Sequence, residues 1–168
     1  IIDTAALVTL QAMPNGSKCP FRNDVKLELR KGGCVWLTGD SGAGKTTLST
    51  FLAGLSNQGA LNRLDIKALL TWNPSIPNSQ RCGVLFQQTT LIDELTVAGN
   101  LAIALKAANV SESTILPKIK HLMESVGLDY ERDANKKPSQ LSGGMGRRAS
   151  LALQLAQKKH VIVLDEPF

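Results

Sequence analysis

The chain has 168 residues, a formal charge of +5 and a hydrophobic content of 43%, values typical of a globular domain with a sizeable core. Aromatic residues make up only 4% and the basic residues are scattered, so the composition argues against a nucleic-acid-binding surface. The chain contains no run of eighteen apolar residues, so we expect no direct insertion into a membrane. Cys19, Cys34 and Cys82 lack metal or redox spacing, which indicates reduced thiols in a cytosolic compartment.

Two segments near the N-terminus have β character. Residues 3–28 contain short alternating stretches around the turn signal Pro14-Asn15-Gly16, which predicts an antiparallel β element. Residues 61–80 are expected to add more irregular β structure.

Residues 39–46 carry the most informative motif of the chain. The sequence Gly39-Asp40-Ser41-Gly42-Ala43-Gly44-Lys45-Thr46 fits the phosphate-loop pattern G-x-x-x-x-G-K-[ST]. Residues 34–38 before it predict a buried strand, in which Cys34 is interpreted as a small core residue, and residues 46–55 after it predict a helix. The helix has one apolar face, formed by Leu48, Phe51, Leu52 and Leu55.

A strand, a glycine loop and a helix in this order direct backbone N–H groups and the positive end of the helix dipole at one point. Lys45 can neutralise the terminal phosphates, and the Thr46 hydroxyl can ligate Mg²⁺. The alternative is a glycine-rich turn with a solvated lysine. The flanking strand and helix favour a nucleotide site, because they are the context that the motif requires.

From Thr96 onward the apolar periodicity becomes helical. Val97, Leu101 and Leu105 share one helical face, and a second helix is expected through Ile119 with Gly127 as its C-cap. Residues 129–140 are interpreted as a polar linker.

Residues 141–148 form a second candidate anion site. Ser142, Gly143 and Gly144 precede a helical stretch that runs to about Lys158, so they form a helix N-terminus with exposed N–H groups. The stretch has Leu151, Ala152 and Leu155 as its apolar stripe. Taken alone, these residues equally fit an ordinary helix N-cap.

Residues 160–166 end in two carboxylates. Four consecutive aliphatic residues, 161–164, predict a strand covered on both faces, and Asp165 lies at its carboxyl end, where open α/β sheets bind ligands. Asp165 can hold Mg²⁺, and Glu166 can act as a general base toward an attacking water. Without the phosphate loop upstream, a solvated acidic pair at a strand end would be the simpler reading.

The ordered motifs resemble those of the ATP-binding subunits of ABC transporters, and the similarity covers nearly the whole chain. Residues 39–46 correspond to that family's Walker A loop, 161–166 to Walker B with its glutamate, and 141–145 to the signature sequence. Residues 84–87 resemble the Q-loop, and residues 95–101 resemble the stretch that begins the helical subdomain. The ending 165–168 is similar to that of bacterial importer subunits.

The resemblance implies an α/β P-loop NTPase with a RecA-like core, an N-terminal antiparallel β subdomain and an inserted helical subdomain at about 96–150, within one domain spanning 1–168. It implies ATP and Mg²⁺ as ligands. The catalytic residues would be Glu166, Gln87 and Lys45, and the metal ligands Thr46, Gln87 and Asp165. Nucleotide contacts would come from Gly39, Asp40, Ser41, Gly42, Ala43, Gly44, Lys45, Thr46, Thr47, Ser142, Gly143 and Gly144.

The family's mechanism implies two kinds of partner. A second copy of the domain would pair head to tail, so that Ser142 contacts the γ-phosphate bound by the other copy. Membrane-spanning permease subunits would hold the protein at the cytoplasmic face of the cell membrane. ATP hydrolysis would then energise solute transport, with import favoured by the family-level similarity.

Three features depart from the family pattern. Met145 replaces the usual glutamine of the signature, and Gly99 stands where glutamate is frequent. Residues 11–18 contain no aromatic side chain for stacking on adenine, which we expect to lower affinity and base selectivity without abolishing phosphate binding.

The sequence stops directly after the Walker B motif, and neither His121 nor His160 fits the family's switch histidine. We therefore expect the chain to be a fragment with little ATPase activity of its own. Two alternatives to a transport ATPase stay open. One is an ABC-type ATPase that acts in translation or DNA repair, and the other is a nucleotide-binding but catalytically inactive fragment.

Overall fold

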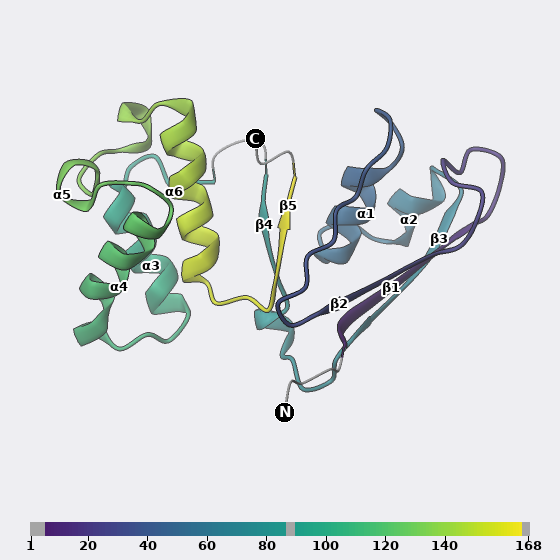
Figure 1. Ribbon diagram of the computed structural model, residues 1–168, viewed down its shortest axis with the longest axis horizontal. Helices are drawn as coiled ribbons and strands as arrows, with labels where there is room; N and C mark the ends of the chain where they lie inside the picture. Colours follow the sequence, from purple (N-terminus) through teal and green to yellow (C-terminus); the bar gives the residue numbers. More distant parts are fainter. Residues whose placement is uncertain (1–5, 87–89, 166–168) are drawn as a thin grey trace. The chain divides into compact units, whose positions relative to one another are not determined.

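The chain forms two compact units, and each has its own core. The computed structural model describes residues 6–86 and 90–165. The units comprise Ile1–Cys82 and Gly83–Phe168 (Figure 1). Among the residues described, no helix has the length and apolar character needed to cross a bilayer.

The first unit is built on a three-stranded antiparallel sheet. Its strands are β1 (Ala6–Pro14), β2 (Val25–Arg30) and β3 (Ile66–Trp72), in the order β2-β1-β3. Leu10 in the central strand lies opposite Leu27 on one side and Leu70 on the other. The antiparallel β element predicted for residues 3–28 is confirmed, and the β structure expected within 61–80 is strand β3.

Two helices lie against one face of this sheet. They are α1 (Lys45–Leu52) and α2 (Gln58–Asn62), and a 3-10 turn, η1 (Asn78–Gln80), follows β3 (Figure 1). The core between the helices and the sheet consists of six buried residues: Leu10, Ala12, Leu27, Leu48, Leu61 and Ile66. The predicted helix after the phosphate loop is therefore confirmed, although Leu55 lies beyond its end and is 60% exposed.

The strand predicted for residues 34–38 is not formed. This segment is irregular, Cys34 is exposed, and the Trp36 side chain is 76% exposed, so the interpretation of Cys34 as a core residue is wrong. The physical reason is pairing: a strand is stabilised by hydrogen bonds to a neighbour, and none of the described strands pairs with these residues.

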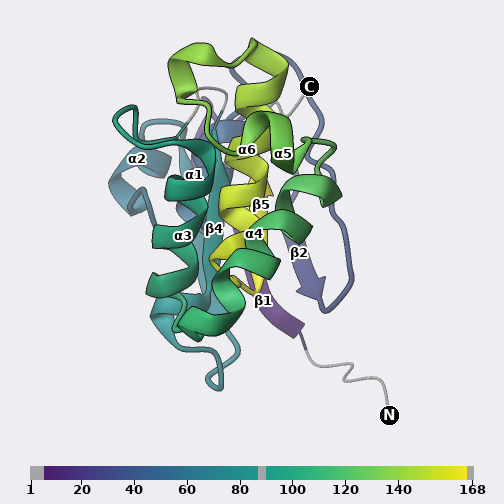
Figure 2. The ribbon, with the colours of Figure 1, turned by 90° about the vertical axis from the view of Figure 1, so that its left-hand side faces the viewer.

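The second unit combines a helical bundle with a pair of strands. Its helices are α3 (Val97–Ala107), α4 (Glu112–Ser125), α5 (Tyr130–Asp133) and α6 (Gly143–Ala156), with a 3-10 turn η2 (Pro138–Gln140) before α6. Strand β4 (Cys82–Leu85) begins at the boundary between the units and is hydrogen-bonded to β5 (Val161–Leu164). Figure 2 looks onto α3 and α4, with α6 behind them.

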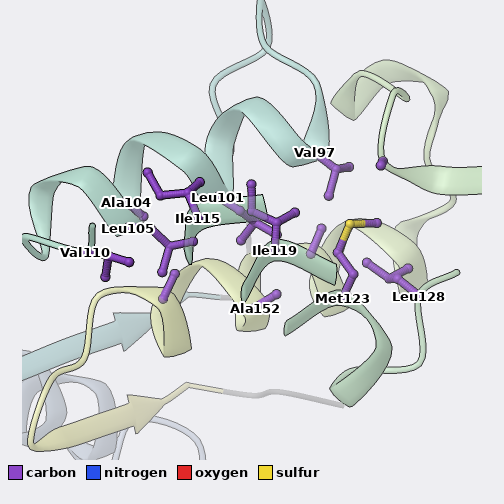
Figure 3. Packing of buried hydrophobic residues seen from close by; sticks show 13 residues of the cluster. Val97, Leu101, Ala104, Leu105, Val110, Ile115, Ile119, Met123, Leu128 and Ala152 are labelled. Carbon is purple, nitrogen blue, oxygen red and sulfur yellow. The ribbon is translucent and has the colours of Figure 1, made fainter. Parts of the chain in front are cut away.

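The core of the bundle follows the predicted helical periodicity. Val97, Leu101 and Leu105 on α3 are at most 2% exposed, and Met123 on α4 is fully buried (Figure 3). Gly127 follows α4 with φ 75°, the left-handed conformation expected of a glycine that ends a helix. On α6 the predicted stripe is only partly right, because Ala152 is buried but Leu155 is 40% exposed.

A buried asparagine fixes the loop that enters α3. The Asn100 side chain is 2% exposed, accepts the Ile92 N–H at 2.7 Å, and donates to the carbonyls of Ile92 at 3.1 Å and Thr96 at 3.0 Å. Thr96 in turn caps the helix by accepting the Gly99 N–H at 3.0 Å. The loop at residues 92–96 is therefore tied to the helix by side-chain bonds at both ends.

A buried carboxylate organises the segment predicted to be a polar linker. Asp133 is fully buried, and its carboxylate accepts from Arg132 Nε at 3.0 Å, Arg132 Nη2 at 2.9 Å and Lys136 Nζ at 2.7 Å. These hydrogen bonds hold the pKa of Asp133 well below its usual range. The carbonyls of Lys136 and Ala134 accept the Val97 and Ala98 N–H groups at 2.8 and 3.0 Å, so this segment caps the start of α3. The linker interpretation for residues 129–140 is accordingly corrected.

We expect Asp133→Asn to destabilise the protein in a pH-dependent way. At pH 7 the loss should be about 1–3 kcal/mol in the free energy of unfolding, because charge-assisted bonds to Arg132 and Lys136 are weakened. A carboxylate with a lowered folded-state pKa stabilises the native state above its unfolded pKa, and this contribution is lost as the pH falls through the folded value. The difference in the free energy of unfolding between wild type and variant should therefore shrink as the pH falls below about 4.

Urea unfolding of both proteins at pH 7, 5 and 3 measures this difference. Asp93→Asn is the matched control, because Asp93 is exposed and its replacement removes the same charge. A difference that stays constant from pH 7 to 3 would contradict the assigned role of the Asp133 carboxylate.

Candidate nucleotide-binding site

The glycines of the phosphate loop adopt conformations that other residues rarely reach. Gly42 and Gly44 have φ values of 81° and 82°, and Gly39 has φ 147°. Gly44 is buried and is the N-cap of α1, so the loop leads directly into the helix. The N–H groups of the loop and the positive end of the α1 dipole therefore belong to one continuous element, which suits an anion.

The Lys45 ammonium lies within this loop. Its Nζ atom donates to the carbonyl oxygens of Gly39 and Asp40, each at 2.8 Å. The Asp40 carbonyl also accepts the Ala43 N–H at 3.1 Å, which closes a turn under the ammonium. The side chain is thus bonded to neutral backbone acceptors of the loop, which a phosphate could replace with stronger charge-assisted bonds.

The remaining loop residues differ in exposure. Asp40, Ser41 and Thr46 are exposed, whereas Ala43 and Thr47 are half-buried. Thr46 lies in the first turn of α1, next to Lys45. The structure therefore brings together all of the predicted loop residues, 39–47, in the first unit.

The signature residues lie at the start of α6 in the second unit. The Ser142 hydroxyl accepts the Met145 N–H at 3.3 Å and is the N-cap, as predicted. Ser142, Gly143 and Gly144 are all exposed, and a Cβ on Gly143 would meet nothing within 4 Å. Met145, which replaces the usual glutamine, is half-buried and packs against the helical core.

The predicted Walker B residues begin at the end of β5. Asp165 directly follows this strand, and its N–H donates to the Leu85 carbonyl at 3.0 Å, which ties it to the end of β4. Gln87 and Glu166 lie outside the described residues. The loop lies in one unit, and Asp165 and Ser142 lie in the other, so their assembly into one site stays a prediction.

Three residues that shape these elements were not predicted from the sequence. Asn100 and Asp133 fix the segments around α3, and Asp65 fixes a turn near the phosphate loop. Asn100 had a sequence signal, because it belongs to the stretch that resembles the start of the helical subdomain. Asp65 and Asp133 had none, since a single acidic residue in a polar segment is ordinarily solvated.

Comparison with known proteins agrees with these features. The family described as ABC transporter matches residues 22–168. The chain belongs to this family. The match includes the phosphate loop, the signature and the Walker B strand, so the predicted P-loop NTPase fold is confirmed at the level of the family.

Several curated relatives are similar over most of the chain. It is 37% identical to the spermidine/putrescine import ATP-binding protein PotA of Thermotoga maritima over 145 residues, which are 86% of the chain and 38% of the relative. It is 37% identical to the sulfate/thiosulfate import ATP-binding protein CysA of Vibrio vulnificus, covering 87% of the chain and 42% of the relative. It is 38% identical to the methionine import ATP-binding protein MetN 2 of Salmonella choleraesuis, covering 86% and 43%. The chain thus spans about two fifths of the length of these relatives.

A pair of glycine variants tests the loop geometry. Gly42→Ala and Gly44→Ala both place a side chain at a positive φ, which costs roughly 1–2 kcal/mol. A Cβ at Gly44 would also lie 3.2 Å from Leu64 Cδ1, whereas one at Gly42 would face open space. We therefore expect Gly44→Ala to lower the free energy of unfolding more than Gly42→Ala does, as measured by urea denaturation. Equal losses in the two variants would contradict the packing described for Gly44.

Proposed function

We propose that the intact protein binds MgATP and hydrolyses it to energise solute import, as the ATP-binding subunit of an ABC transporter. The observation that carries this proposal is the loop at 39–46, in which glycines with positive φ lead into α1 and the Lys45 ammonium donates to two carbonyls of the same loop. Membership of the ABC transporter family supports the transport role, and so do the names of the three relatives described above, each an import ATP-binding protein.

Each predicted residue has a role in this proposal. The loop amides and Lys45 hold the phosphates, and Ser142, Gly143 and Gly144 contact the γ-phosphate bound by a second copy. Glu166 takes a proton from the attacking water, and Gln87 positions that water. The protein would work at the cytoplasmic face of the cell membrane, held there by permease subunits.

Thr46 and Asp165 suit Mg²⁺, because hydroxyl and carboxylate oxygens are the donors that this ion prefers. Thr46 is exposed in the first turn of α1, next to Lys45, so its hydroxyl is suitably placed for an ion bound to the phosphates. Gln87 would complete the protein ligands. When bound, Mg²⁺ would neutralise phosphate charge and orient the β- and γ-phosphates.

Membership of the family does not indicate which solute the transporter would carry. The relatives of similar identity import polyamines, sulfate or methionine according to their names, so the ATP-binding chain alone does not distinguish among these chemical classes. The proposed helical subdomain at about 96–150 includes α3, α4, α5 and the first part of α6, which begins at the signature.

We expect Lys45→Ala to weaken MgATP binding by roughly tenfold to a hundredfold, because a charge-assisted bond to phosphate is lost. Isothermal titration calorimetry on the intact protein measures this loss. Lys67→Ala is the matched control, since Lys67 is exposed in the same unit and its loss changes the net charge equally. Unchanged affinity in Lys45→Ala, or an equal loss in Lys67→Ala, would contradict the proposed phosphate site.

We expect Ser142→Ala to reduce the steady-state ATPase rate at least tenfold while MgATP affinity at the phosphate loop stays within about twofold of wild type. The reason is that Ser142 acts on nucleotide bound by the other copy. Ser139→Ala, which alters an exposed serine three residues earlier, is the control. Full turnover in Ser142→Ala would show that the signature serine has no part in hydrolysis.

A further inference from the structure

Strand β3 lies at one edge of the sheet in the first unit. In the part of the chain that the structure describes, β3 pairs with β1 on one side and with no strand on the other. An edge strand leaves a row of backbone N–H and C=O groups to which an extended segment of another chain can bond. Because successive residues of a strand turn their backbone groups to opposite sides, this free row belongs to every second residue of β3.

A side chain of α2 occupies the first part of this edge. The Gln58 Nε2 atom donates to the Ile66 carbonyl at 2.7 Å, and the Gln58 Oε1 atom accepts the Ala68 N–H at 3.2 Å. A primary amide has the donor and the acceptor of a peptide group, so Gln58 bonds to β3 as the backbone of an added strand would. The free row therefore starts at Ile66 and Ala68 and continues with Leu70 and Trp72.

Helix α2 holds the Gln58 amide at this position. Gln58 is half-buried, and its Nε2 atom also donates to the Asn62 Oδ1 atom at 3.0 Å, one turn further along the helix. Leu61 on the same helix is fully buried in the core of the first unit. The amide is thus attached to a packed element rather than to a free surface side chain.

Two copies of β3 fit each other in an antiparallel register. A twofold axis at Leu70 would place the two Leu70 residues opposite each other, and Ala68 of one copy opposite Trp72 of the other. The free rows of both strands would then face each other with donors opposite acceptors. This register needs the Ala68 N–H, which the Gln58 amide already occupies.

The exposed side chains of β3 also suit this register. Leu69, which is 56% exposed, would lie opposite Thr71 of the other copy and gain a partly apolar neighbour. Lys67 would lie opposite the uncharged Asn73, so no like charges would be directly opposed. A second copy therefore matches the edge in backbone bonding, in apolar contact and in charge.

We propose that the β3 edge is a strand-pairing surface for a second copy of this chain, and that the Gln58 amide keeps this surface closed. The amide and the added strand compete for the same Ala68 N–H, so removal of the amide favours pairing. This inference does not depend on nucleotide binding. The head-to-tail pairing of the proposed function uses the phosphate loop and the signature, whereas this pairing uses β3.

The test is sedimentation equilibrium of the intact protein without nucleotide. We expect Gln58→Ala to lower the Kd for self-association at least tenfold relative to wild type, because one competing set of hydrogen bonds is lost in each copy. Gln58→Met removes the amide but keeps the length of the side chain, and should act in the same direction. Gln80→Ala, at an exposed position of the same unit, is the matched control and should leave the Kd unchanged.

A second substitution locates the interface. Leu69→Lys, added to Gln58→Ala, should restore the wild-type Kd, because the two introduced lysines would lie diagonally across the paired strands and repel each other. Leu69 is exposed, so this change leaves the core intact. A wild-type Kd in both Gln58 variants, or tight self-association that Leu69→Lys does not weaken, would overturn the inference.

Discussion

The phosphate loop depends on a backbone that turns through left-handed conformations at Gly42 and Gly44. These two residues let the chain reverse tightly before α1 begins at Lys45, and they bring the Lys45 side chain back over the carbonyls of Gly39 and Asp40. Gly44 is also closely packed against Leu64, so a side chain there would disturb both the loop and its support. The loop is therefore defined by backbone geometry first and by the charge of Lys45 second.

In the second unit, buried polar side chains fix the irregular segments, whereas in the first unit glycines shape the phosphate loop. Asn100 and Asp133 have their hydrogen-bonding groups satisfied by nearby backbone and cationic side chains, and each fixes an irregular segment next to α3. The segment held by Asp133 continues through η2 to Ser142, the N-cap of α6. Asp133 lies nine residues before the signature serine in the sequence. Removing a partner from such a cluster costs more than the same change at the surface, because a buried polar group is left unsatisfied.

Much of this structure could be predicted from local patterns. The alternating residues around Pro14 form the β1–β2 hairpin, the apolar spacing in 97–105 forms the buried face of α3, and the glycine at 127 ends α4. The motif at 39–46 could be found from the sequence because its residues are contiguous, and its role in binding nucleotide stays a prediction. The errors concern tertiary contacts. Residues 34–38 have strand composition but no described partner strand, and Leu155 has the right spacing on α6 but is 40% exposed. Asp65 and Asp133 could not be found, since their roles depend on contacts that a sequence pattern does not specify.

In the proposed function, residues 39–46 bind the triphosphate of a nucleotide through backbone amides and the Lys45 ammonium. The most direct measurement is the ¹H–¹⁵N NMR spectrum of the intact protein during titration with MgATP. We expect the amide resonances of Gly42, Ala43, Gly44 and Lys45 to shift in proportion to occupancy, and to shift more than those of the exposed residues on strands β1 and β2. Unchanged positions of these four resonances at saturating MgATP would contradict phosphate binding by this loop.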